Sequence, residues 1–243
     1  MKNTRYTALI CLFSLIALMA SACASVSSMQ TPGVVPQGEV RWAISSSGAG
    51  GAGNNTESDS PSKISTSADP NFEASVRYGA AENFDIGLKI NFAGAQISGK
   101  YQFMKGDFDL ALGLEAGYQY IRTNGTDTPD THVIELQVPL LMEYHFNPYV
   151  GLAFGPKFLG IYAIDSDNSA VYKSGCDSND CRDDIWGISG LYTGIMIGMP
   201  LRLTEGIWFM PEINVYGNAY DSNEDSFTHV LWQAGVSVFF GGL

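Results

Sequence analysis

The chain has few charged residues. Asp, Glu, Lys and Arg make up 16% of it, whereas an average soluble protein has about 25%. Acidic residues outnumber basic ones by 25 to 13, which gives a formal net charge of −12. A chain so poor in cations does not suit the phosphate backbone of nucleic acid, and we expect no nucleic-acid partner.

Long apolar runs are absent after residue 22. No later stretch approaches the ~20 apolar residues that a membrane-spanning helix needs. A chain can be poor in charge without such helices if apolar residues alternate along β-strands. The 243 residues, with 27 glycines, 12 tyrosines and 13 phenylalanines, are enough for one large all-β domain.

The first 22 residues predict an export signal. Lys2 and Arg5 form a short positive region, and residues 8–20 form an apolar segment that is too short to span a membrane. The sequence Ala-Ser-Ala-Cys at residues 20–23 then resembles the lipobox of bacterial lipoproteins, in which the cysteine becomes the lipidated N-terminus. We expect a lipid on Cys23 and a small, polar tether over residues 23–36. Ordinary cleavage after residue 22 is the alternative.

Cysteine is scarce, with four residues in the chain. Cys11 lies in the signal and Cys23 is the expected anchor. Cys176 and Cys181 stand five apart in a polar stretch of an exported chain, which predicts a loop disulfide. The stretch lacks the further thiols or imidazoles that a zinc site needs. We expect no metal site and no cofactor.

From residue 37 onward, apolar and polar residues alternate with a period of two, which predicts strands. We expect strands at 37–47, 72–78, 84–92, 97–103, 108–120, 134–146, 150–162, 191–203, 207–215 and 230–240. Short turns at 81–83, 105–107, 147–148 and 204–206 alternate with connections that are mostly longer and polar. This pattern is typical of an antiparallel up-and-down transmembrane β-barrel. Ten strands are expected, with eight as the alternative.

Residues 37–243 resemble the small outer-membrane β-barrel proteins of Gram-negative bacteria. The stretch CASVSSMQTPGVVPQGEVRW, residues 23–42, is similar to the start of lipoprotein-type barrels. The resemblance implies a periplasmic N-terminus, extracellular long loops, and outer-membrane lipids and lipopolysaccharide as partners. The competing fold is a soluble, lipid-tethered barrel or sandwich. We favour the membrane barrel because the polar positions of the strands are largely Gly, Ser, Gln and Asn, and because aromatic residues gather near strand ends.

The polar positions also carry the charges that we expect inside the barrel. These are Arg41, Arg77, Lys89, Lys100, Lys157, Glu73, Asp85, Glu115, Glu135, Glu143 and Glu212, with Glu39 and Asp109 in the same alternation. A ten-stranded barrel is narrow and its side chains fill much of the interior. We therefore expect a network of ion pairs that closes the lumen, with Glu73 beside Arg77 and Asp85 beside Lys89 on single strands. The excess of carboxylates makes a narrow cation-preferring pore the first alternative.

Catalytic motifs are not recognisable, and we expect a structural or surface-binding role and no enzyme. Of the three histidines, His229 lies four residues after Asp225 and close to Ser226. That spacing leaves a hydrolase at the extracellular mouth as the second alternative.

The long loops are acidic, as in the stretches 165–169, 177–184 and 221–225. Their carboxylates could gather divalent cations that bridge lipopolysaccharide, although none of the stretches matches the EF-hand spacing. The alternative is that the loops are simply solvated.

Overall fold

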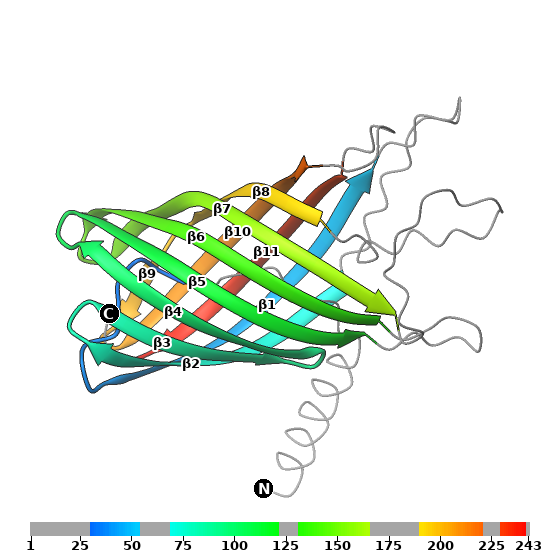
Figure 1. Cartoon of the computed structure of the whole chain (residues 1–243). Coiled ribbons are helices and arrows are strands. Elements are labelled where there is room, and N and C mark those ends of the chain that lie inside the picture. Colours follow the sequence, from blue (N-terminus) through cyan, green and yellow to red (C-terminus); the bar gives the residue numbers. More distant parts are fainter. Residues whose placement is uncertain (1–29, 54–68, 122–130, 166–189, 221–228, 242–243) are drawn as a thin grey trace, which may run out of the picture.

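The computed structural model describes residues 30–53, 69–121, 131–165, 190–220 and 229–241. The strands are β1 (Val40–Gly53), β2 (Asp69–Ala81), β3 (Phe84–Asn91), β4 (Gly94–Met104), β5 (Phe108–Ile121), β6 (Thr131–Asn147), β7 (Val150–Asp165), β8 (Gly190–Gly198), β9 (Leu201–Thr204), β10 (Ile207–Tyr220) and β11 (His229–Phe240). All the pairings between these strands are antiparallel, and β11 pairs with β1, so the sheet closes on itself (Figure 1).

Strands β8 and β9 together form one strand of the barrel, interrupted at Met199 and Pro200. The pairing with β10 keeps one register across the gap, because Gly198 lies opposite Glu212 and Leu201 lies opposite Phe209. Pro200 has no N–H to donate to the ladder, which explains the interruption. The barrel therefore has ten strands, and the prediction of ten strands is confirmed.

The two ends of the barrel differ, as the turn pattern predicted. Short turns join β2 to β3, β4 to β5, β6 to β7 and β9 to β10 at one end, which we call the turn end. The opposite end, the loop end, includes a short link between β3 and β4. There the Asn91 Oδ1 atom accepts hydrogen bonds from the backbone N–H groups of Ala93 (2.9 Å) and Gly94 (2.6 Å).

The glycine-rich run at residues 48–53 follows the expected end of the first strand at residue 47, but it belongs to β1. Its pairing with β11 continues to Gly53 opposite His229. A Cβ atom on Gly50 would lie 2.7 Å from the indole of Trp232. Glycine here leaves space for that ring on the neighbouring strand, so close packing explains the glycine at position 50.

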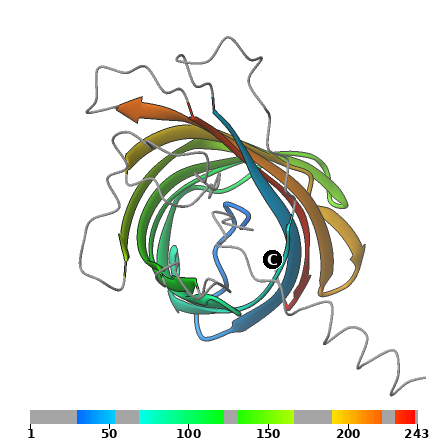
Figure 2. The ribbon, with the colours of Figure 1, turned by 90° about the vertical axis from the view of Figure 1, so that its right-hand side faces the viewer.

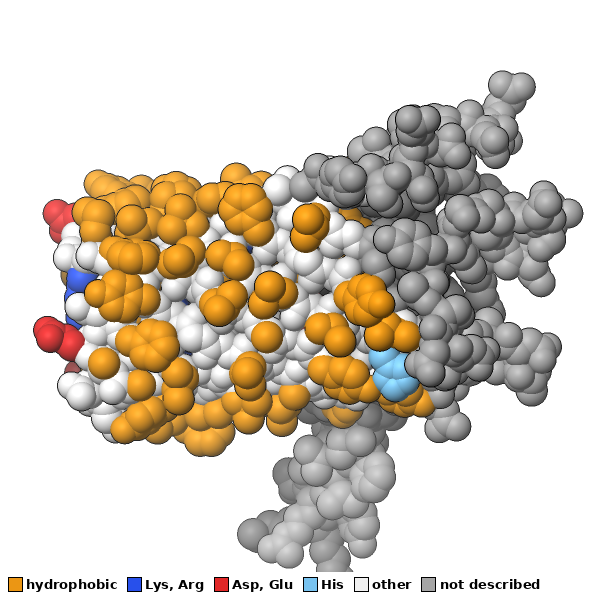
Figure 3. All heavy atoms as spheres, viewed as in Figure 1, with side chains coloured by type: hydrophobic (Ala, Val, Ile, Leu, Met, Phe, Trp, Pro, Cys, Tyr) orange, Lys and Arg blue, Asp and Glu red, His pale blue; other side chains and the backbone are white. Residues whose placement is uncertain are grey.

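The outer surface of the barrel is apolar. Trp42, Ile44, Ile97, Leu114 and Leu136 are between 51% and 64% exposed. Apolar side chains cover the flank in Figure 3, whereas charged side chains on the face shown appear at one end. Soluble monomers rarely expose continuous apolar surface of this extent. An apolar exterior around a polar interior is the arrangement of a transmembrane barrel and argues against the soluble alternative.

Exposed aromatic side chains lie toward both ends of the barrel. Tyr118 and Tyr120 lie toward the loop end, and Tyr144, Phe146 and Tyr149 toward the turn end; all are at least 41% exposed. Such girdles are typical of membrane interfaces. Among the described residues, no helix is long and apolar enough to cross a membrane.

Two of the aromatic residues expected at strand ends lie inside. Phe239 is 4% exposed, whereas Phe240 next to it is 40% exposed. Trp208 packs against the interior cluster of Ala43, Met210 and Phe239. Successive residues of a strand face opposite sides of the sheet, so one member of each adjacent pair has to point inward.

Candidate functional site

The chain enters the lumen before β1 begins. Figure 2 shows the stretch that precedes β1, in blue, inside the ring of strands. Gln37 forms a bridge with Gly79 of β2, and the Gly38 N–H donates to the Gly79 carbonyl at 2.9 Å. From there back to Gln30, the chain runs from the turn end toward the middle of the barrel. We call Gln30–Pro36 the internal segment.

The barrel holds the internal segment largely by its backbone. The Lys100 ammonium donates to the carbonyls of Thr31 (2.7 Å) and Gly33 (2.8 Å). The Asp85 carboxylate accepts the Val35 N–H at 3.0 Å. Further bonds run from Val34 N to Gln102 Oε1 (3.3 Å), from Arg41 to the Gly33 carbonyl (3.4 Å), and from Gln30 Nε2 to Glu115 Oε1 (2.6 Å). Thr31 and Val35 are 2% and 1% exposed, so the segment is packed inside up to Val35, whereas Pro36 is exposed.

This position differs from the expected tether over residues 23–36, of which the structure describes the part from Gln30. The small and polar residues of this stretch carry no period that marks it for burial. The segment is buried because the charged groups of Lys100 and Asp85 form hydrogen bonds with its backbone. Charged groups buried away from water require partners, and the segment's carbonyl and N–H groups supply them.

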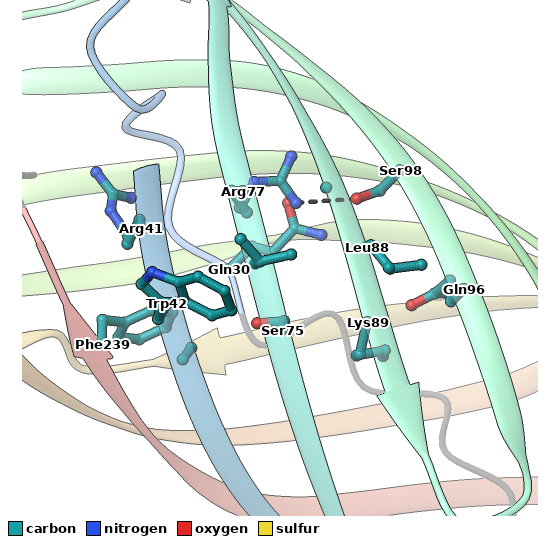
Figure 4. A pocket seen from close by; sticks show the side chains of 13 residues that line it. Gln30, Arg41, Trp42, Ser75, Arg77, Leu88, Lys89, Gln96, Ser98 and Phe239 are labelled. Carbon is teal, nitrogen blue, oxygen red and sulfur yellow. Dashed lines mark hydrogen bonds between the residues drawn. The ribbon is translucent and has the colours of Figure 1, made fainter. Parts of the chain in front are cut away.

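A cluster of charges surrounds the segment near the turn end. Arg77 forms an ion pair with Asp85, and its Nε atom donates to Asp85 Oδ1 at 3.0 Å. The Lys100 Nζ atom lies 3.5 Å from Asp85 Oδ2. Arg77 also donates to the Ser98 hydroxyl at 3.0 Å (Figure 4). Arg41 is 3% exposed and interacts electrostatically with Asp85 and Glu143.

The ion pairs join neighbouring strands, which corrects the expected pairs Glu73–Arg77 and Asp85–Lys89. Arg77 of β2 instead pairs with Asp85 of β3, and Lys89 of β3 lies 3.7 Å from Glu73 of β2. Residues four apart on a strand are separated by about 13 Å. Diagonal neighbours on adjacent strands are only about 7–8 Å apart.

An acidic cluster occupies the lumen beyond the internal segment. It consists of Glu73, Glu115, Glu135 and Glu212, together with Lys89 and Lys157. Lys89 interacts electrostatically with all four carboxylates, and Lys157 with those of Glu212, Glu115 and Glu135. The cluster thus holds four carboxylates and two ammonium groups.

Neutral polar side chains connect much of the acidic cluster. The Lys157 ammonium donates to Asn214 Oδ1 (2.8 Å), and Asn214 donates to Glu212 (2.6 Å). Gln96 and Gln119 donate to the two oxygens of Glu135 at 3.2 and 3.1 Å. The network is incomplete, because Glu115 Oε2, Glu212 Oε2 and both amide atoms of Gln137 have no hydrogen-bond partner in the described part of the chain.

A third group of charges lies at the rim of the turn end. The His145 Nε2 atom is 3.1 Å from Asp109 Oδ2, and its Nδ1 atom is 3.4 Å from Glu143 Oε1. The Glu143 side chain is 4% exposed and that of His145 is 32% exposed. Glu39, expected among the lumen charges, is exposed and precedes β1.

The inner surface of the barrel has two unlike walls. On β1–β5 the buried apolar residues of the described part are alanines, at 43, 49 and 111. We call this surface the polar wall. On β6–β11 large apolar residues point inward: Val133, Leu141, Leu159, Ile161, Tyr192, Met196, Met210, Tyr216, Leu231 and Phe239.

A small cavity lies beside the internal segment. A cavity of about 20 Å³ lies at the polar wall, and Gln30, Arg77, Lys89 and Gln96 are among the residues that line it (Figure 4). Such a volume accommodates about one water molecule. At this point of the described lumen, side chains and the segment therefore leave room for little more than one water molecule.

The remaining expected sites lie outside the described residues. These are Cys23, the pair Cys176 and Cys181, and the acidic stretches 166–169, 177–184 and 221–225. His229 is the first residue of β11, but Asp225 and Ser226 lie outside the described part. Within the described ranges, no three His, Cys, Asp or Glu side chains come together closely enough to hold a metal ion.

Comparisons with known proteins give remote similarities. No protein-family model and no curated protein matches the chain. Among solved structures, Neisserial surface protein A (NspA) is 11% identical, with 81% of this chain and 96% of that chain covered and a TM-score of 0.37. The attachment invasion locus protein Ail of Yersinia pestis is 11% identical, with coverages of 84% and 99% and a TM-score of 0.31. The outer membrane protease OmpT of Escherichia coli is 8% identical, with coverages of 88% and 100% and a TM-score of 0.47.

These values are too low to carry a function over to this chain. The class of protein follows from the barrel itself. Its strand pairing, apolar exterior and polar interior define a closed, ten-stranded β-barrel of the transmembrane type.

Proposed function

We propose that the protein is a lipid-anchored β-barrel of the bacterial outer membrane, with a closed lumen and a structural or surface-binding role. The internal segment is the observation that supports the closed lumen most directly. Lys100 is 1% exposed, and its ammonium is bound to two backbone carbonyls of the segment. An open, water-filled pore would hydrate this charge, whereas here the chain itself satisfies it.

The proposed orientation places the turn end in the periplasm and the loop end outside the cell, as is usual for such barrels. The partners that we propose are outer-membrane lipids and lipopolysaccharide around the barrel. Divalent cations at the acidic loops would bridge the loops to lipopolysaccharide phosphates. The surface-binding role then belongs to residues at the loop end.

Conductance of the refolded protein in planar bilayers tests the closed lumen. Folding is checked first by a heat-dependent shift in gel migration. We expect an inserted barrel without sustained conductance. Frequent, discrete conductance steps from the unmodified protein would overturn the closed lumen and establish the pore.

The second candidate function is a narrow cation-preferring pore. The observation in its favour is the acidic cluster, where four carboxylates lie around two lysines. Rings of carboxylates favour cations over anions in channels.

We propose no catalytic role. Any hydrolase activity found in a preparation should survive His229→Ala. Loss of such activity in a variant that still folds would instead support the barrel enzyme.

A further inference from the structure

The internal segment lies against one wall of the lumen, and that wall is polar along its length. At the turn end it presents Arg77, Asp85 and Lys100 to the segment. Past Gln30 the wall continues toward the loop end with buried Asn71, Glu73, Gln96 and Gln119, which are 1–5% exposed. A continuous polar strip therefore joins the two ends of the barrel, and the segment covers its turn-end half.

The segment is held by hydrogen bonds and packing, which can break without any covalent change. Most of its hydrogen bonds join its backbone to the side chains of the wall. Its own side chains are small or of medium size. Where it enters the lumen it passes very close to β2, since a Cβ atom on Gly79 would lie 2.1 Å from the Pro36 carbonyl oxygen. Its docking thus depends on Lys100 from one side and on a missing side chain at Gly79 from the other.

If the segment left the lumen, the charged groups of Lys100 and Asp85 would lose hydrogen-bond partners and would have to be hydrated. The ammonium of Lys100 would lose two carbonyl partners, and the carboxylate of Asp85 would lose the Val35 N–H. Buried ions without partners are strongly unfavourable, so water would replace the segment along the polar wall. That water would meet the acidic cluster, where carboxylates outnumber ammonium groups.

We propose that the internal segment is a displaceable plug, and that a barrel from which it has withdrawn conducts small cations along the polar wall. The proposal rests on the closed-lumen barrel described under the proposed function. It adds a latent activity, which is the conduction of small cations, and it names the internal segment as the element that controls this conduction.

Two single substitutions in the full-length protein weaken the docking in independent ways. Lys100→Met removes the donor to Thr31 and Gly33 but keeps a long side chain. Gly79→Ala leaves all polar groups in place and pushes a methyl group against the Pro36 carbonyl. The matched controls are Lys105→Met and Gly106→Ala at the turn end, because Lys105 is exposed and a Cβ on Gly106 would meet nothing within 4 Å.

The first measurement is single-channel current in a potassium chloride gradient. We expect Lys100→Met to open roughly 10- to 100-fold more often than the parent, as the loss of one or two hydrogen bonds to a charged group implies. Gly79→Ala should also open more often than the parent, because its methyl group would force the Pro36 carbonyl to move. The reversal potential should show a preference for potassium. Both controls should remain as quiet as the parent.

The second measurement reports the segment itself. Thr31→Cys places a thiol at a site that is 2% exposed. A polar thiol reagent should label it slowly in the parent and in the control backgrounds, and at least about tenfold faster with Lys100→Met or Gly79→Ala. The protein without the Thr31→Cys change gives the background from native cysteines.

The outcomes separate the two proposals. If Lys100→Met and Gly79→Ala fold but show no channel openings, the proposal that the segment controls conduction is overturned, whether or not the thiol becomes accessible. The closed-lumen barrel would not be affected by this result. Anion preference in the open variants would overturn the cation path. Sustained conduction by the parent would overturn the closed lumen itself. If Lys100→Met does not fold, Gly79→Ala decides the matter, because it changes no charge.

Discussion

The ammonium of Lys157 on β7 donates a hydrogen bond of 2.8 Å to the side-chain oxygen of Asn214 on β10. Strand β8 lies between these two strands in the sheet, so the bond crosses the lumen side of β8. Lys157 also lies over the ring of Tyr216, with Nζ 5.5 Å from the ring centroid. Side-chain contacts inside the lumen thus join β7 to β10, in addition to the backbone hydrogen bonds between neighbouring strands.

This relationship predicts a strong dependence on charge balance. Lys157→Met should lower the free energy of unfolding by about 3–5 kcal/mol, because it removes one of two cations from four buried carboxylates. Adding Glu212→Gln should restore part of the loss, since the two groups interact. Urea unfolding of refolded protein, followed by gel migration, measures both effects. Additive losses in the double variant would contradict the coupling.

The apolar exterior predicts a dependence on depth in the membrane. Leu114 is 56% exposed and lies near the middle of β5, whereas Phe146 is 59% exposed at the turn end of β6. In lipid vesicles, Leu114→Arg should destabilise the barrel by about 2–4 kcal/mol and Phe146→Arg by about 0–1 kcal/mol. Equal and small effects would indicate that water, and not lipid, surrounds the strands.

The turn-end charges predict an asymmetry between two aspartates. Asp85 is fully buried between Arg77 and Lys100, whereas Asp107 is exposed in a turn. Asp85→Asn should lower the free energy of unfolding by about 3–5 kcal/mol because it leaves two buried cations without their carboxylate. Asp107→Asn, the matched control, should change it by less than about 0.5 kcal/mol. A similar small change in both variants would show that water reaches Asp85.

The lipid anchor makes a prediction that is independent of the barrel interior. Cys23→Ser should abolish incorporation of a clickable fatty acid into the protein in cells, because the thioether forms on the cysteine sulfur. The double variant Cys176→Ser and Cys181→Ser is the control and should still incorporate the label. Incorporation that survives Cys23→Ser would rule out lipidation at this residue.

The fold was largely predictable from the sequence because each strand alternates between lipid and lumen. Trp42 and Ile44 face outward while Arg41 and Ser45 face inward, and this period of two also places the lumen charges. The ion-pair partners were not predictable from one strand, because the pairing of Arg77 with Asp85 depends on the register between β2 and β3.

The internal segment had no local signal. Val34, Val35 and Pro36 form a short apolar run among small and polar residues, which is compatible with a tether. Apart from Arg41, the hydrogen-bond partners that fix the segment come from β3, β4 and β5, 50 to 85 positions later in the chain. Only the completed ring brings these residues together.

The position of this segment also constrains the order of assembly. β1 follows it directly in the chain and forms the seam of the ring with β11, whose register runs from Trp42 opposite Phe240 to Gly53 opposite His229. A ring that has already closed cannot admit a chain from the side. The segment must therefore bind to β2–β5 before β1 and β11 pair. Otherwise it must enter the closed barrel end-on, through one of its open ends. In the first case, the pairing of β11 with β1 encloses the segment, and the lumen is closed from the moment the barrel forms.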